Sequence, residues 1–222
     1  MTRSMFESRR ALLLLGMFVL AGCEDDPSAP EDPVLTEGRD TIEVIDDFDL
    51  SAFAVRNGDA EFWRVEDGAL IGDGIVEHSP IVHESGTIED GWIEVELDRA
   101  DDGGIVFRYQ DDANYYLVGL RDDATSVGPS GENSNIELYR FTDGQWESLI
   151  YGGVDVSWPR GQRVVIRVWA IEDVLLVFFG DYLVLGAQDS HGFASGGLGL
   201  RTNSHFGAES SVRYRVLRWG TF

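Results

Sequence analysis

Residues 102–146 read DGGIVFRYQDDANYYLVGLRDDATSVGPSGENSNIELYRFTDGQW, and this stretch decides the fold class. It holds three short runs, at 104–110, 114–121 and 135–141, that are rich in β-branched and aromatic residues. Asp, Asn, Gly or Ser bounds each of these runs. Because β-branched and aromatic residues favour strands and the bounding residues favour turns, the stretch predicts antiparallel strands joined by turns.

The first of these runs alternates between two kinds of side chain. Successive residues of a strand point to opposite faces of the sheet. One face of the run carries Ile105, Phe107 and Tyr109, and the other carries Val106, Arg108 and Gln110. We therefore expect one face to enter a hydrophobic core and the other face to present polar groups.

Similar runs continue on both sides of this stretch. We expect strands at 42–48, 62–65, 69–71, 91–98, 163–170, 174–179, 182–185, 198–201 and 212–219. A buried helix would be the rival for 174–185, but Gly180 and Asp181 break that region and its β-branched and aromatic content favours a hairpin. About a dozen short strands without a convincing amphipathic helix predict an all-β sandwich of two antiparallel sheets.

The order of these features resembles a known family. GIVFRY at 104–109, DDANYY at 111–116 and LYRFTDGQW at 138–146 are followed by GDYLVL at 180–185 and GGLGLRTN at 196–203. This order resembles the concanavalin A-like sandwich, in the branch with laminin-G-like domains and the β-sandwich modules attached to bacterial glycoside hydrolases. The resemblance covers roughly residues 46–222 and implies a jelly roll. Many activities share this fold, so the resemblance implies architecture more than function.

The first residues of the chain predict where the protein is located in the cell. Basic residues precede an apolar run at 11–20, which is too short for a comfortable membrane span and lies where a secretory signal belongs. The run ends in LAGC at 20–23, which resembles the lipobox of bacterial lipoproteins. We expect residues 1–22 to be a signal peptide and Cys23, the only cysteine, to be lipidated. A plain secreted protein with an unpaired cysteine is the alternative.

The residues after Cys23 predict a tether and one domain. Residues 23–40 hold prolines among acidic residues and have almost no apolar content, so they cannot offset the entropy of ordering. Residues 41–222 are enough for a single two-layer core. We therefore expect a domain that a disordered tether and a lipid hold at the bacterial cell envelope, on the periplasmic face or the cell surface.

The charge of the chain limits its partners. The formal net charge is −23, and every basic residue is an arginine. Residues 1–22 hold three arginines and one glutamate, so the remaining chain carries −25. Phosphate contacts would be repulsive for such a surface, which excludes nucleic acid and disfavours anionic lipid and anionic polysaccharide.

Three carboxylates of one expected strand are candidates for catalysis. Glu94, Glu96 and Asp98 alternate on one face, and glycosidases need two carboxyl groups about 5 to 9 Å apart. The pattern resembles the E-x-D-x-E strand motif of the sandwich-fold glucanases, with Glu96 where that family has Asp. Solvated carboxylates on an exposed strand are the alternative, and we assign no catalytic residue.

Other motifs for catalysis are weaker. No G-x-S-x-G elbow occurs, and the four histidines show no metal-ligand spacing. Gly197-Leu198-Gly199 lacks the third glycine of a dinucleotide site. Some periplasmic domains of this outline resemble 3-keto-disaccharide hydrolases, but no catalytic motif of that family can be matched here.

Sugar recognition has more support. It needs an aromatic platform and planar hydrogen-bonding groups. Arg108, Glu137 and Tyr139 share one strand parity, and the opposite parity gives a good core. Arg201 and Asn203 end a later strand. We expect these five residues to bind a ligand; the alternative is that the tyrosines pack and the arginines pair with surface acids.

Calcium is the one cofactor that the sequence suggests, because it takes six to eight oxygen ligands and structural calcium recurs in the families that this chain resembles. The loops offer Asp46, Asp47, Asp101, Asp102, Asp111, Asp112, Asp122 and Asp123. Paired aspartates also serve turns, so the metal ligands stay open.

We therefore expect a lipid-anchored envelope protein whose domain binds carbohydrate. A periplasmic glycoside-processing enzyme, of the 3-keto-disaccharide hydrolase or glucanase type, is the first alternative. A protein–protein interaction module is the second, since laminin-G-like domains also bind proteins.

Overall fold

Strands form nearly all regular structure in residues 40–56, 60–74, 79–124, 135–150, 152–203 and 210–222, which are those that the computed structural model describes. The expected signal peptide, the lipidation site Cys23 and nearly all of the tether lie outside these residues. Within them, no helix is long and apolar enough to cross a membrane. The compact unit runs from Gly38 to Phe222, and all its strand pairs and its core lie inside it.

The first sheet has eight strands in the order β13-β12-β11-β6-β15-β4-β3, with β1 also paired to β15. Its strands are β1 (Asp40–Ile45), β3 (Trp63–Glu66), β4 (Ala69–Gly74), β6 (Gly91–Ala100), β11 (Val164–Ile171), β12 (Val174–Phe179), β13 (Tyr182–Gln188) and β15 (Ser210–Thr221). Every pair is antiparallel. The hairpin expected at 174–185 is present as β12 and β13.

The second sheet has seven strands in the order β10-β9-β8-β7-β14-β5-β2. Its strands are β2 (Phe53–Val55), β5 (Ser79–Ile88), β7 (Gly103–Asp111), β8 (Asn114–Leu120), β9 (Ile136–Thr142), β10 (Gln145–Ser148) and β14 (Gly196–Thr202). These pairs are antiparallel too. Two short 3-10 turns, Leu50–Ala52 and Ala60–Phe62, flank β2 and β3.

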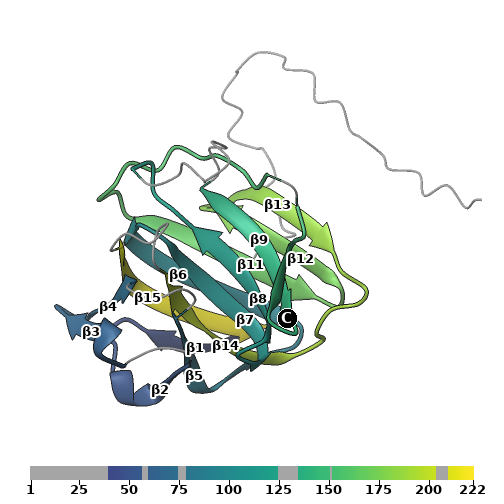
Figure 1. Cartoon of the computed structure of the whole chain (residues 1–222), viewed down its shortest axis with the longest axis horizontal. Helices are drawn as coiled ribbons and strands as arrows, with labels where there is room; N and C mark the ends of the chain where they lie inside the picture. Colours follow the sequence, from purple (N-terminus) through teal and green to yellow (C-terminus); the bar gives the residue numbers. More distant parts are fainter. Residues whose placement is uncertain (1–39, 57–59, 75–78, 125–134, 151, 204–209) are drawn as a thin grey trace, which may run out of the picture. The chain divides into compact units, whose positions relative to one another are not determined.

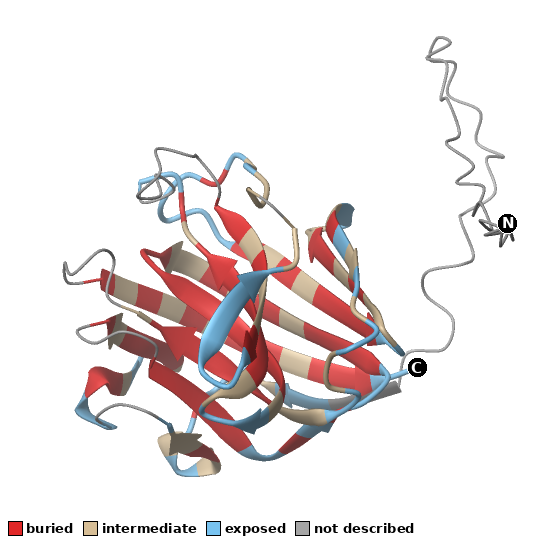
Figure 2. Cartoon of the chain, turned by 45° about the vertical axis from the view of Figure 1, so that its right-hand side comes forward, coloured by how far each residue is buried: buried red, intermediate tan, exposed pale blue. Residues whose placement is uncertain are grey.

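The two sheets lie face to face, as Figure 1 shows, and the core fills the space between them. Ile93, Val95 and Leu97 of β6 are fully buried, and Ile105 and Phe107 of β7 are buried in the same cluster. Figure 2 shows buried residues alternating with less buried ones along the strands. The period-two pattern of the sequence therefore sets which side chains enter the core, and the all-β prediction is confirmed.

The alternation of β7 breaks at Arg108. This residue has a positive φ of 48°, and the register between β7 and β8 shifts between Phe107 and Asp111. One strand therefore carries extra residues, as in a β-bulge, and the side chains beyond it change face. Tyr109 packs with Val106 in a cluster outside the main core instead of following Phe107 into it.

Candidate functional site

The register of the second sheet aligns four residues across its outer face, the face turned away from the core. Glu137 pairs with Gly119, Gly119 with Gly104, and Gly104 with Arg201. We call these four residues the central row. Neighbouring strands lie about 4.8 Å apart, so two polar side chains face one another over two glycines across about 14 Å.

Gly119 of the central row leaves room for a flat aromatic ring, and Leu117 fills the space over Gly104. A Cβ atom at Gly119 would lie 3.4 Å from Cε2 of Tyr139, so the ring lies close above this glycine. Trp146 of β10 meets the Tyr139 ring edge to face, with ring centroids 5.6 Å apart, and is 64% exposed. Beneath them is a buried apolar layer, which consists of Val106, Tyr115, Leu117 and Phe141. Tyr139 and Trp146 thus form an aromatic platform.

Charged residues of alternating sign border this platform. Arg121 donates to Glu137 over 2.8 Å, and its Nε lies 4.0 Å from Oδ2 of Asp102. Asp102 also faces Nη1 of Arg201 at 3.4 Å and accepts a hydrogen bond from Asn203 at 3.0 Å. Two arginines and two carboxylates therefore form one balanced cluster.

Burial and charge fix the protonation states at this site. Burial lowers the pKa of Arg121, but the charges of Asp102 and Glu137 outweigh it and leave the pKa above its usual value. Burial, and then the hydrogen bond to Glu137, raise the pKa of Tyr139 well above its usual value. Arg121 therefore presents a charged guanidinium group and Tyr139 a neutral phenol at physiological pH.

The hydrogen bonding of Arg201 is incomplete. This residue is 4% exposed, its contact with Asp102 is long, and its Nε has no hydrogen-bond partner among the described residues. A buried donor without an acceptor costs about 1–3 kcal/mol, so such groups usually meet a ligand or a water. The outer face therefore holds a donor that a ligand oxygen can use.

The other sheet supports this row from below. Tyr214 of β15 crosses the core, and its hydroxyl accepts from the N–H of Gly104 at 2.8 Å. It lies 2.7 Å from the carbonyl of Arg201 and 2.9 Å from that of Gly104, to either of which it can donate. A Cβ atom at Gly103 would lie 2.9 Å from this hydroxyl. Glycine at position 103 is thus needed for this close approach.

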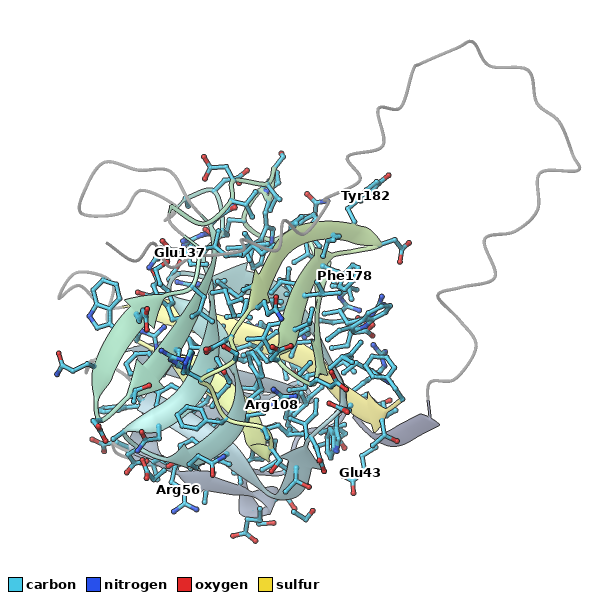
Figure 3. The ribbon with its side chains drawn as sticks, turned by 90° about the vertical axis from the view of Figure 1, so that its right-hand side faces the viewer. Glu43, Arg56, Arg108, Glu137, Phe178 and Tyr182 are labelled. Carbon is cyan, nitrogen blue, oxygen red and sulfur yellow. The ribbon has the colours of Figure 1, made fainter. Side chains whose placement is uncertain are left out.

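The structure brings together four of the five residues expected to bind a ligand: Glu137, Tyr139, Arg201 and Asn203. It places Arg108 elsewhere, as Figure 3 shows for Arg108 and Glu137. Arg108 is 1% exposed and donates to three main-chain carbonyls, those of Glu89, Glu172 and Phe193, at 2.7, 2.8 and 3.0 Å. It fastens three loops at one end of the sandwich.

Three further residues of the site were not expected from the sequence. Arg121 and Asp102 lie two positions beyond the glycines of the central row, and Trp146 lies opposite Phe141 in the β9–β10 hairpin. Asp102 lies two residues before Gly104, and Arg121 lies two residues after Gly119. The period of two could therefore have placed these side chains on the same face as the glycines. Trp146 required knowledge of the hairpin register.

The candidates for catalysis lie on the outer face of the first sheet, among arginines. Glu94 accepts from Arg167 at 2.6 Å and from Arg218 at 2.7 Å. Glu96 accepts from Arg218 at 2.8 Å, and Asp98 accepts from Arg215 at 2.7 Å. We call this set the charged ladder. Each of its three carboxylates is bound by an arginine, and none adjoins the aromatic platform of the second sheet.

Several of the aspartates offered for calcium bind protein groups. Arg160 bridges Asp101 and Asp122, and Asp123 accepts from the main chain of Trp158. Asp111 accepts from the N–H of Ala113 in a turn, and Asp102 belongs to the outer-face cluster. In the described part of the chain, no three His, Cys, Asp or Glu residues gather as a metal site.

A separate cavity lies at the end of the sandwich that Arg108 fastens. Its volume is about 330 Å³. Glu89, Asp90, Glu172, Asp173, Asp189, Ser190, Gly192, Phe193 and Ala194 line it. Asp189 is held by Tyr116 at 2.8 Å and by Arg140 at 2.6 Å. The cavity is acidic, in contrast to the balanced cluster of the outer face.

Comparisons with known proteins support the fold. No family model matches the chain, and a search of curated proteins finds no sequence match. Among solved structures, the carbohydrate binding module CBM66 from Bacillus subtilis is similar, with a TM-score of 0.57, 20% identity, and coverage of 74% of this chain and 93% of that chain.

Two further solved structures are similar. One is the kappa-carrageenase from Pseudoalteromonas carrageenovora with an oligotetrasaccharide of kappa-carrageenan. Its TM-score is 0.56 and its identity is 11%, and the match covers 87% of this chain and 99% of that chain. The other is a LamA variant from Z. galactanivorans with laminaritriose and laminaritetraose. Its TM-score is 0.52 and its identity is 12%, and the match covers 82% of this chain and 98% of that chain. These likenesses show a concanavalin A-like jelly roll, as the sequence resemblance implies.

Proposed function

We propose that this protein binds carbohydrate on the outer face of its second sheet. The observation that carries the proposal is the buried Nε of Arg201, which has no partner among the described residues and lies on the same sheet face as an aromatic platform. Sugars present hydroxyls to polar groups and apolar ring faces to aromatic side chains. Similar structures include a carbohydrate binding module and complexes with oligosaccharides, which agrees with this proposal.

The test is affinity electrophoresis of residues 38–222, the unit that contains its own core, in gels that hold a panel of polysaccharides. We expect at least one glycan to retard the protein without being shortened. Trp146→Ala should weaken this retardation about tenfold, which corresponds to about 1.4 kcal/mol. The matched control is Tyr182→Ala, because Tyr182 is also an exposed aromatic residue, at 79%, but lies in the first sheet.

Equal retardation of the wild type and Trp146→Ala would contradict the proposed face. If no glycan retards the wild type, carbohydrate binding itself is contradicted, and a protein partner becomes the leading hypothesis.

The second candidate function is glycoside hydrolysis, and the acidic end cavity is the observation that favours it. Five of its nine lining residues are Asp or Glu, and glycosidases act through paired carboxyl groups. If the wild type shortens a glycan, Glu89→Gln or Glu172→Gln should stop the cleavage while Glu94→Gln leaves it intact. Cleavage that depends on Glu94 would instead indicate that the charged ladder holds the catalytic carboxylates.

We also propose that Cys23 anchors the protein to a membrane of the bacterial cell envelope. The support is the LAGC sequence at 20–23, after an apolar run. Metabolic labelling with a fatty acid should label the full chain, and Cys23→Ser should remove the label. Labelling that survives Cys23→Ser would contradict this anchor.

A further inference from the structure

We infer that the ligand of the outer face is a neutral glycan, recognised through its hydroxyls, rather than a uronate or sulfated glycan. This inference rests on the proposed function and adds the substrate class to it. Its basis is the arrangement of charges around the central row, together with the hydrogen-bonding capacity of each group.

The charges of the site alternate along one line. Glu137 binds Arg121 at 2.8 Å, Arg121 lies 4.0 Å from Asp102, and Asp102 lies 3.4 Å from Arg201. Guanidinium groups only donate hydrogen bonds, and ionised carboxylates only accept them. Every step along the line therefore places a donor beside an acceptor.

A sugar hydroxyl is suited to this line because it both donates and accepts. At Arg201 it can accept from the buried Nε and donate to a carboxylate oxygen of Asp102, which is 4% exposed. Neutral sugars carry such hydroxyls on adjacent carbons. The same arrangement can therefore bind two hydroxyls of one ring of the glycan while another ring packs on the platform of Tyr139 and Trp146.

A carboxylate or sulfate is not suited to it. Such a group accepts only, so it can use Arg201 but must also approach Asp102 and Glu137, whose side chains are 5% and 18% exposed. Like charges at short range in a partly buried site repel each other more strongly than in water. The formal charge of −23 of the whole chain adds to this repulsion at low salt.

The experiment measures retardation of residues 38–222 by paired polymers at 50 mM and 500 mM NaCl. The neutral probes are galactan, laminarin, mannan and xylan, and the anionic probes are carrageenan, alginate and polygalacturonate. We expect at least one neutral glycan to bind, each anionic probe to bind at least tenfold more weakly, and salt to change the neutral affinity less than twofold.

The matched variants are Glu137→Gln and Glu84→Gln. The first removes a negative charge inside the site, and the second removes one outside it. Glu137→Gln should weaken the neutral glycan severalfold and reduce the discrimination against anionic probes, and Glu84→Gln should change neither. Near-ultraviolet circular dichroism checks that both variants are folded.

The outcomes separate this inference from the proposed function. Tighter binding of an anionic probe that Trp146→Ala weakens would overturn the neutral class and leave carbohydrate binding on this face intact. Binding of a neutral glycan that Glu137→Gln and Trp146→Ala leave unchanged would overturn both the inferred contacts and the proposed face. No binding of any probe would overturn both claims.

Discussion

The outer faces of the two sheets carry the same residue types in different arrangements. On the first sheet, Glu94 pairs directly with Arg167 on one neighbouring strand and with Arg218 on the other. On the second sheet, two glycines separate Glu137 from Arg201. Neighbouring charges satisfy each other in the charged ladder of the first sheet, whereas on the second sheet the Nε of Arg201 has no partner among the described residues.

This difference shows that charge content alone does not mark a binding face. The charged ladder is at least as rich in arginine and carboxylate as the outer face of the second sheet, and its three carboxylates are all paired. The two glycines between Glu137 and Arg201 distinguish the second sheet, because the first sheet also has an exposed aromatic residue, Tyr182. The following changes test this contrast, beginning with the largest expected effect.

Tyr214→Phe should remove the support beneath the second sheet's outer face. It deletes the hydroxyl that bonds the main chain of Gly104 and lies beside the carbonyl of Arg201. Loss of one partner of a buried group costs about 1–3 kcal/mol, so the free energy of unfolding should fall by about that amount. Glycan affinity should fall as well, because Arg201 loses a fixed main-chain position.

Urea unfolding and affinity electrophoresis measure the two effects of Tyr214→Phe, with Tyr182→Phe as the exposed control. Lower stability with unchanged affinity would show that Tyr214 supports the fold and not the face.

Glu94→Gln should break the charged ladder without touching the binding face. It weakens two ion pairs of a carboxylate that is 12% exposed, and we expect a loss of stability of about 1 kcal/mol. Thermal unfolding measures this loss. Retardation by a glycan should match the wild type, and a clear fall in affinity would contradict the separation of the two faces.

Gly119→Ala should make the second face more like the first by narrowing its gap. The new Cβ atom would lie 3.4 Å from the Tyr139 ring, which is ordinary contact, so stability should change by less than about 1 kcal/mol. The methyl group should nevertheless narrow the space between Glu137 and Arg201 and weaken glycan binding about fivefold. Titration calorimetry with the bound glycan checks this; unchanged affinity would show that this space is not needed.

The smallest effect should be a change of stability with pH, caused by protonation of His83, which lies on the core side of β5. His83 packs between Phe53 and Trp219 and accepts from the N–H of Gly86 at 3.0 Å. Burial lowers its pKa, although nearby glutamates oppose this shift. The unfolded state therefore binds the proton more readily, so stability is complete above pH of about 6.5 and declines as pH falls below it.

Urea unfolding at several pH values should show this decline for the wild type and a smaller one for His83→Gln. Glycan affinity should stay constant from pH 6.5 to 9, because Arg121 and Tyr139 both have raised pKa values. If the affinity falls as the pH rises from 6.5 to 9, the Tyr139 phenol is not neutral over this range.

Local alternation made much of this architecture predictable. The parity of β9 predicted that Glu137 and Tyr139 leave the core, and the structure places both on the outer face. The same rule failed for Arg108 because its positive φ changes the face of the following residues. The Arg108 side chain donates to carbonyls of loops far along the chain, and a local pattern cannot show those contacts.

Other features of the site depend on pairing between distant residues. Asp102, Arg121 and Arg201 meet only when β7, β8 and β14 are in register. The strand β5 was missed because its polar centre, residues 83–86, interrupts the alternation that marks a strand. A sequence pattern can assign a residue to a face, but cross-strand register decides which residues of that face are neighbours.

The pairing of β1 with β15 has a mechanical consequence. Asp40 lies opposite Thr221 and Ile45 opposite Leu217, and β15 is itself held by β6. A pull at Asp40 along the strand axis would load the bonds between β1 and β15 together, in shear, instead of opening them one at a time. If Cys23 anchors the domain and a glycan binds its second sheet, as proposed, this shear geometry resists the drag on the bound polymer.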